Sequence, residues 1–173
     1  AITFTTFAAG TDTFIAANAS WKYLDNGSNQ GTAWRNYSYD DSAWATGTAE
    51  FGYGDGDETT VVSYGSNPEQ KHLTTYFRKS FTVINPSAYT ALTLGVIYDD
   101  GVVVYLNGTE VYRNNMPAGN INYNTPAIVS VSGSAESAWT TIDLNPSLFT
   151  TGTNILTAEV HQISYDSSDL SFN

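Results

Sequence analysis

The sequence contains no cysteine, so disulfide bonds, thiolate catalysis and cysteine-ligated zinc sites are all excluded. Its two histidines, His72 and His161, are too few for a three-histidine zinc centre. No apolar run approaches the roughly 20 residues needed to cross a bilayer, which excludes insertion into a membrane. The chain also opens without the charged and then apolar segment of a signal peptide, as we expect of a processed product or an excised module.

Basic residues are scarce as well. The chain has 6 Lys and Arg against 17 Asp and Glu, which gives a formal net charge of −11 at pH 7. So negative a surface repels nucleic-acid phosphates and anionic membranes, and we expect neither as a partner. Neutral ligands such as polysaccharides, and divalent cations, are compatible with this charge.

What the chain does contain is typical of strands and turns. Charged residues make up only 13% of the 173 residues, whereas glycine and tyrosine are abundant. Short β-rich runs recur between turn residues, and this pattern predicts an all-β fold, an antiparallel β-sandwich of the jelly-roll type. The expected strands are residues 2–7, 13–16, 21–24, 76–83, 92–98, 102–106, 109–112, 128–131, 139–144, 155–163 and 170–172. Helix is expected only as single turns at 41–44 and 146–149, the second capped by Asn145. The length, without a repeat or linker, predicts one domain, residues 1–173.

The clearest local signal is a β-hairpin. Asn107-Gly108 joins two β-rich runs, and both turn positions suit residues that tolerate positive φ. The preceding turn contains Asp99-Asp100-Gly101, and turns at the rim of a sheet are frequent binding sites. The connections 52–73 and 114–127 are too long for tight hairpins, and long ordered loops of this kind usually have a function.

Six motifs occur in an order that resembles a known family. They are Trp21 to Gly27, Asp40 to Trp44, Phe51 to Gly56, Tyr76 to Phe81, Asp99 to Gly108 and Gly152 to Gln162. This set resembles the galactose-binding-like jelly-roll accessory module of secreted bacterial multidomain proteins, which is similar to carbohydrate-binding modules. More loosely, it resembles the sugar-binding domain that precedes the catalytic barrel in many β-glycosidases. The resemblance implies a non-catalytic β-sandwich attached to other domains of a secreted or cell-surface protein.

The Asp99-Asp100-Gly101 turn is locally similar to the paired-aspartate turn of PA14 sugar-binding domains, which implies Ca²⁺ as a candidate cofactor at Asp99 and Asp100. Adjacent carboxylates supply the oxygen ligands that Ca²⁺ requires. The alternative is an ordinary tight turn, in which each aspartate bonds its own backbone. Asp169, in a second acidic loop, completes the expected metal set if the fold brings it alongside. Another oxygen cluster, Asp55 with Asp57 and Glu58, lies in a glycine-rich loop but lacks EF-hand spacing.

Aromatic residues in loops are candidates for stacking on sugar rings, because sugars present apolar C–H faces beside dense hydroxyls. The loop set is Trp34, Tyr37, Tyr39, Tyr53, Tyr64 and Tyr123. Trp21, Trp44 and Trp139 lie in strand-like or packing motifs, and we expect them in the core. Any single loop ring is more often an anchor for its own loop than a stacking surface.

Polar candidates complete the expected site. Arg113 opens the loop that follows the hairpin, where it offers donors to a carboxylate or a sugar diol or, equally, ties down its own loop. Asn115, in the same loop, offers donors and acceptors for sugar hydroxyls. Strand alternation places His161 and Glu159 on one face, as a polar pair for orientation or proton transfer. The alternative for His161 is a buried histidine satisfied by hydrogen bonds.

These observations predict a non-catalytic carbohydrate-binding module of a secreted bacterial protein, which binds polysaccharide through loop aromatics and polar loop residues. No Gly-x-Ser-x-Gly motif is present, and we expect no enzymatic activity. The alternative is a structural module that packs against a catalytic domain and binds no sugar.

Overall fold

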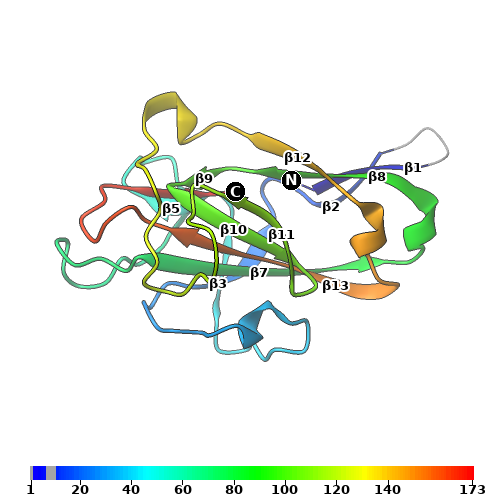
Figure 1. The fold of residues 1–173 in the computed structure, drawn as a ribbon, viewed down its shortest axis with the longest axis horizontal. Coiled ribbons are helices and arrows are strands. Elements are labelled where there is room, and N and C mark those ends of the chain that lie inside the picture. Colours follow the sequence, from blue (N-terminus) through cyan, green and yellow to red (C-terminus); the bar gives the residue numbers. More distant parts are fainter. Residues whose placement is uncertain (1, 7–10) are drawn as a thin grey trace.

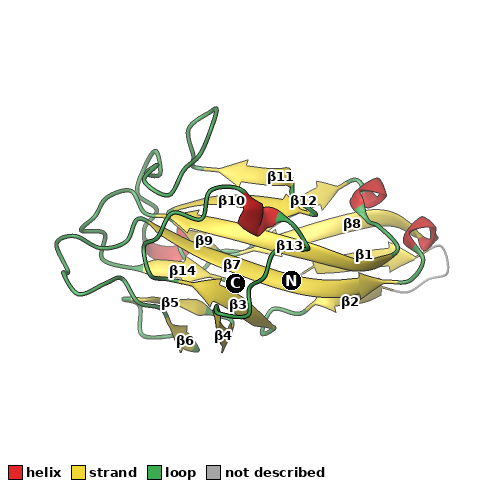
Figure 2. Cartoon of the chain, turned by 90° about the horizontal axis from the view of Figure 1, so that it is seen from below, coloured by secondary structure: helices red, strands yellow, loops and turns green. Residues whose placement is uncertain are grey.

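The structure is a computed structural model that describes residues 2–6 and 11–173. The described part is an antiparallel β-sandwich with 42% strand and 7% helix, as predicted. Its long strands run along the molecule, and helix is confined to short turns (Figure 2). None of the described helices is long and apolar enough to cross a membrane. Phe7, the last residue of the first expected strand, lies outside the described residues.

One layer of the sandwich is a six-stranded antiparallel sheet, the large sheet. Its order is β11 (Thr109–Asn114), β10 (Gly101–Leu106), β13 (Gly152–His161), β7 (Thr74–Val83), β3 (Ser20–Leu24) and β4 (Ala45–Thr48). Figure 1 shows β7 and β13 side by side along its centre. Asn107 and Gly108, with φ of 53° and 82°, form the predicted hairpin between β10 and β11.

Two four-stranded sheets form the other layer. The first has the order β12 (Thr140–Leu144), β8 (Tyr89–Val96), β1 (Ile2–Thr6) and β2 (Thr11–Ile15). The second, the small sheet, has the order β6 (Thr60–Val61), β5 (Phe51–Tyr53), β14 (Leu170–Phe172) and β9 (Tyr98–Asp99). The 3₁₀ turns are η1 (Ala33–Arg35), η2 (Pro86–Ala88), η3 (Gly133–Ala135) and η4 (Pro146–Leu148).

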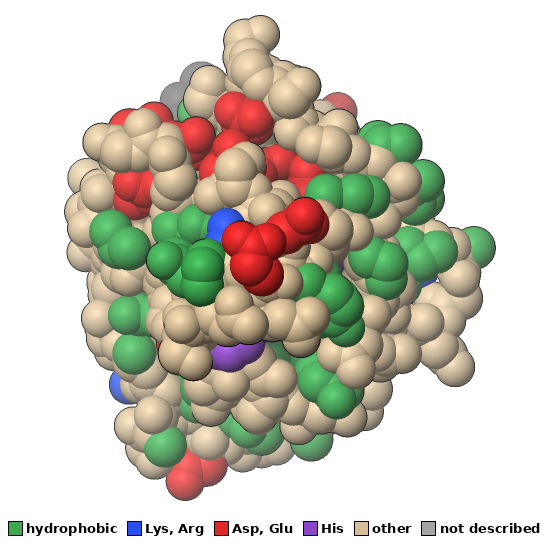
Figure 3. All heavy atoms as spheres, turned by 90° about the vertical axis from the view of Figure 1, so that its left-hand side faces the viewer, with side chains coloured by type: hydrophobic (Ala, Val, Ile, Leu, Met, Phe, Trp, Pro, Cys, Tyr) green, Lys and Arg blue, Asp and Glu red, His purple; other side chains and the backbone are tan. Residues whose placement is uncertain are grey.

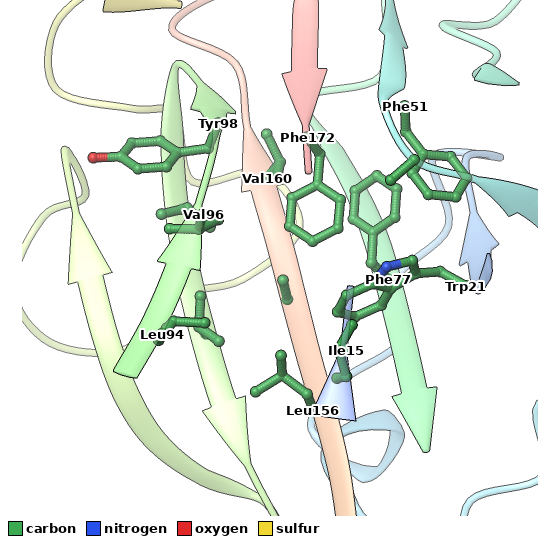
Figure 4. Close-up of a cluster of buried hydrophobic side chains, with 14 of the residues drawn as sticks. Ile15, Trp21, Phe51, Phe77, Leu94, Val96, Tyr98, Leu156, Val160 and Phe172 are labelled. Atoms are coloured by element: carbon green, nitrogen blue, oxygen red, sulfur yellow. The ribbon is translucent and has the colours of Figure 1, made fainter. Parts of the chain in front are cut away.

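The main core lies between the two layers. Phe77 of β7 stacks on Phe172 of β14 with ring centroids 4.0 Å apart, and Trp21 meets Phe172 edge-on at 5.4 Å (Figure 4). Aromatic pairs of this kind add roughly 0.5–1.5 kcal/mol each to the free energy gained by burying their area. The prediction that Trp21 belongs to the core is therefore confirmed.

The large sheet is buried on its outer face as well. Along β10, Val102, Val104 and Leu106 belong to the main core, whereas Val103 and Tyr105 belong to a second apolar cluster. That second cluster includes Trp34 and Trp44. Both belong to the segment 25–44, which follows β3 in the chain and contains η1 (Figure 1, blue to cyan). The core position predicted for Trp44 is thus confirmed.

Three local predictions are wrong, and the other helical turn is confirmed. Residues 128–131 form bends instead of a strand, and Trp139 is 44% exposed because it precedes β12, an edge strand with one neighbour. Residues 41–44 form a turn, with the Trp44 amide bonded to the Asp41 carbonyl at 3.0 Å, and not a helix. At η4, the Asn145 side chain accepts a hydrogen bond from the Ser147 amide at 2.9 Å, as expected of a cap.

A buried arginine fixes the segment 25–44 on the large sheet. Arg78 Nε donates to Asp41 Oδ2 at 2.8 Å, and its Nη1 donates to the carbonyls of Trp34 and, at 3.2 Å, of Asn36. Its guanidinium also lies over the Tyr39 ring, 5.1 Å from the centroid. A buried charge is tolerated only when it is paired and hydrogen-bonded in this way, so the course of the segment depends on Arg78.

A second buried network holds η1 and the loop after β11. Glu159 Oε1 accepts hydrogen bonds from Tyr105 Oη at 2.6 Å and from Arg35 Nη2 at 3.1 Å. His161 is fully buried, with Nδ1 2.8 Å from the Thr125 carbonyl oxygen. Because a carbonyl only accepts, Nδ1 carries a hydrogen. Its Nε2 lies 3.5 Å from Glu159 Oε2.

The network sets the pKa of Glu159. Burial on its own raises this pKa, but the neighbouring His161, the Tyr105 hydroxyl and the Arg35 charge outweigh burial and hold the pKa below its ordinary value of 4.5. The unfolded chain therefore binds this proton more tightly than the folded protein does. The stability that Glu159 contributes is complete above about pH 4.5 and is lost as the pH falls through the folded-state pKa.

We predict that Arg78→Met lowers the free energy of unfolding by about 3 kcal/mol, because it leaves Asp41 and several buried carbonyls without their donor. Urea denaturation followed by tryptophan fluorescence measures this change. The matched control is Lys79→Met at the next position, since Lys79 takes part in none of the ion pairs of the described residues. Equal losses in the two variants would contradict the role given to Arg78.

We also predict that the stability gap between the natural protein and Glu159→Gln is wide at pH 7 and narrows below about pH 4.5. At acidic pH the natural carboxyl is protonated and resembles the amide. Urea denaturation at a series of pH values measures the gap, and Glu69→Gln on the exposed surface serves as the control. A gap that stays constant from pH 7 to acid would rule out the lowered pKa.

Candidate functional site

The strongest candidate for ligand binding is a groove beside Tyr37, the Tyr37 groove. Tyr37 follows η1 and is 69% exposed, the largest exposed fraction among the aromatic residues described. The groove has a volume of about 650 Å³. It is lined by Asn36, Tyr37, Ser38, Asn107, Thr150, Thr151 and Thr153. One aromatic ring thus stands beside amide and hydroxyl groups, and none of the lining side chains is charged.

The walls of the Tyr37 groove are held by hydrogen bonds to the sandwich. The backbone of Asn36 is fixed because its carbonyl oxygen accepts a hydrogen bond from the Arg78 guanidinium. Asn107 donates from Nδ2 to Asn154 Oδ1 at 2.8 Å and accepts at Oδ1 from the Ile155 amide at 2.9 Å. Asn154, itself fully buried, in turn bonds the backbone of Thr150. The groove is therefore formed before any ligand arrives, which lowers the entropic cost of binding.

A second hollow, of about 390 Å³, lies between η1 and the loop after β11. Arg113 lines it, but Nε and Nη2 bond the Glu110 carboxylate at 2.8 and 2.7 Å, and Nη1 bonds the Pro117 carbonyl at 2.6 Å. Asn115 similarly bonds Val129, donating from Nδ2 to its carbonyl at 2.6 Å and accepting its amide at 3.0 Å. Arg113 thus anchors its own loop, which is the alternative left open by the sequence, and Asn115 ties the start of that loop to Val129.

The expected set of exposed aromatics is only partly correct. Trp34 is fully buried because it covers the outer face of the large sheet, 4.8 Å from the Tyr76 ring and 5.9 Å from the Tyr105 ring. Tyr53 is buried within β5. The prediction that these two rings face solvent is therefore wrong. His161 is fully buried as well, so the prediction that it contacts a ligand is also wrong. Tyr39, Tyr64 and Tyr123 are half-buried and pack against the apolar clusters, so their contact with sugar stays a prediction.

The paired aspartates have different environments. Both carboxylate oxygens of Asp100 accept backbone hydrogen bonds, from Val131 at 2.7 Å and Ile163 at 2.8 Å. Asp99 is 1% exposed, and neither of its carboxylate oxygens has a hydrogen-bond partner. Burial, followed by the negative charges of Asp100, Asp169 and Glu136, raises the pKa of Asp99 to about 9.

An acidic cluster lies at one end of the molecule, on the left in Figure 1, where acidic side chains gather (Figure 3). Asp55, Glu136 and Asp169 each place a carboxylate oxygen within 4.8 Å of the others. Asp169 therefore joins Asp55 and Glu136, whereas the predicted set of Asp99, Asp100 and Asp169 is not among the acidic clusters of the described residues. No sequence signal marked Glu136, which lies in a Ser- and Gly-rich segment and meets the others only through the fold.

Comparison with known proteins finds similarity in structure alone. No family model matches the chain, and no curated protein matches its sequence. A β-glucuronidase from Bifidobacterium dentium, in complex with coumarin-3-O-glucuronide, is 12% identical with a TM-score of 0.52. An apo β-glucuronidase from Ruminococcus gnavus is 8% identical with a TM-score of 0.50.

These matches cover 91% and 92% of this chain but only 22% and 23% of the enzymes. The chain thus spans under a quarter of their length, and at such low identity the likeness concerns the fold. This chain has the β-sandwich fold of one segment of these glycosidases.

Proposed function

We propose that this chain is a non-catalytic carbohydrate-binding domain of a larger carbohydrate-active protein, and that it binds polysaccharide in the Tyr37 groove. The observation that carries the proposal is the exposed Tyr37 ring above a preformed groove lined by uncharged hydrogen-bonding side chains. In this proposal the larger protein is a secreted or cell-surface bacterial protein, which meets extracellular polysaccharide.

The chemistry of the groove suits a neutral sugar. The apolar face of a sugar ring stacks on an exposed aromatic ring, while its hydroxyls bond to fixed amide and hydroxyl groups. Tyr37 supplies the ring, and Asn36, Ser38 and the threonines supply the polar groups. The net charge of −11 disfavours heavily sulfated or uronate-rich polymers, so the proposed ligand is a neutral polysaccharide.

The groove does not have the composition of a glycosidase active site. Hydrolysis of glycosides ordinarily requires two carboxyl groups that flank the scissile bond, and the lining residues of the groove include no Asp or Glu. The nearby carboxylate of Glu159 is buried and holds Arg35 and Tyr105. These features support a role in attachment and not in catalysis.

A second candidate function is docking against a neighbouring domain of the same protein. Ile128 and Val129 are exposed, at 59% and 58%, and lie next to each other. Hydrogen bonds from the Asn115 backbone and side chain fix both residues in place. An ordered and exposed apolar pair of this kind supports an interface with another domain.

We predict that Tyr37→Ala weakens binding to the preferred polysaccharide by about 1–2 kcal/mol, which is roughly 5- to 30-fold in Kd. Stability should hardly change, because the ring is mostly exposed. Affinity gel electrophoresis over a panel of neutral polysaccharides identifies the ligand, and calorimetry measures Kd.

Tyr165→Ala is the matched control for this test, since Tyr165 is another exposed tyrosine, 46% exposed, that does not line the groove. It should leave binding unchanged. Equal affinity of the natural domain and Tyr37→Ala would exclude the groove as the site. Absence of retardation on every polysaccharide would favour the docking function instead.

A further inference from the structure

The acidic cluster draws its members from three distant parts of the chain. Asp55 lies in the loop after β5, Glu136 at the end of η3, and Asp169 just before β14. The loops of Asp55 and Asp169 pack directly together, because a Cβ on Gly54 would lie 2.8 Å from the Cβ of Asp169. The three carboxylates are therefore brought together by the fold and not by sequence proximity.

A fourth carboxylate faces the same region from the small sheet. Asp99 of β9 pairs with Ser171 of β14, and directly paired residues of neighbouring strands extend their side chains from the same face of a sheet. The Ser171 hydroxyl bonds Asp55 Oδ2 at 3.2 Å. Asp99 thus lies on the sheet face that carries the acidic cluster, with both carboxylate oxygens buried and unpartnered.

No basic side chain neutralises these groups among the ion pairs of the described residues. Lys71, in the loop before β7, donates to the Ser167 carbonyl and lies over the rings of Tyr53 and Tyr64. Carboxylates gathered this closely repel one another, and a cation bound between them relieves that repulsion.

Glu58 organises the loop that carries Asp55. Its carboxylate accepts the amides of Asp55 at 3.0 Å and of Gly56 at 3.1 Å. These bonds fix the backbone of the loop and leave the Asp55 side chain directed to Ser171 and the acidic cluster. Glu58 is in this sense a positioning residue.

We propose that Asp55, Glu136 and Asp169 form a binding site for Ca²⁺ beside the buried, unpartnered carboxyl group of Asp99. The site contains oxygen donors without His or Cys, which suits a hard cation. Ca²⁺ binds oxygens at about 2.3–2.6 Å, so oxygens of one shell lie up to roughly 5 Å apart. The spacing of 4.8 Å or less in the cluster fits that shell.

This site differs in its residues from the Tyr37 groove, and none of its members lines that groove. The cation ties the loops after β5 and before β14 to η3. Its role is to hold this end of the sandwich together, whether or not the domain binds sugar.

Thermal melting of the whole chain tests the proposal, with CaCl₂ alone as the probe after treatment with chelator. The melting temperature should rise with Ca²⁺ and return to the starting value on chelation, because an ion that binds only the folded state stabilises it by mass action. Calorimetry should show that Asp169→Asn weakens Ca²⁺ binding at least tenfold. Mg²⁺, which demands a smaller and more regular shell, should stabilise less.

The matched control is Asp166→Asn, which removes the same charge from the same loop at an exposed position outside the cluster. It should keep the full response to Ca²⁺. If Asp169→Asn does not fold, Asp55→Asn replaces it, with circular dichroism as the check on folding. Equal melting in Ca²⁺ and chelator, or equal Ca²⁺ affinity of the Asp166 and Asp169 variants, would overturn the proposal.

Sugar binding in the Tyr37 groove and Ca²⁺ binding at the acidic cluster are tested independently of each other. Tyr37→Ala should retain the response to Ca²⁺, and Asp169→Asn should retain its affinity for polysaccharide in the presence of a saturating cation concentration. If the domain binds Ca²⁺ but no sugar, the result supports the cation site and contradicts the proposed carbohydrate function.

Discussion

The placement of the Tyr37 groove depends on the contact of one guanidinium with the backbone of the segment 25–44. Arg78 lies on the outer face of the large sheet, and its partners are carbonyls and a carboxylate of that segment. These bonds satisfy a charge that burial would otherwise destabilise by several kcal/mol. They also lead the chain across the sheet, so that Trp34 faces inward and Tyr37, three residues later, faces solvent.

Burial of both faces of the large sheet explains where ligand sites can form. The main core covers the inner face, while Trp34 and Trp44, with the network of Glu159 and His161, fill the outer face. Where these side chains cover the sheet, its surface is closed to a ligand. The groove and the acidic cluster are accordingly built from loops at the rim, which the sheets hold in fixed positions.

Much of the fold could be predicted from local signals. The Asn107-Gly108 turn, the cap at Asn145 and the strand 102–106 depend on neighbouring residues, and the structure confirms each of them. The burial of Trp34 was not predicted, because a turn-rich segment that packs over a sheet has the same composition as a free loop. Glu136 was missed for a related reason, since its partners are 81 and 33 residues away in sequence. Contacts of this range have no local pattern.

Both ends of the described chain supply inner strands of their sheets. β1 lies between β8 and β2, and β14 lies between β5 and β9. During synthesis β5 and β9 therefore cannot be joined until residues 170–172 have been made. Proteolytic loss of residues 170–172 would divide the small sheet in the same way. Assembly of this half of the sandwich is thus a late event, which follows the synthesis of every other described strand.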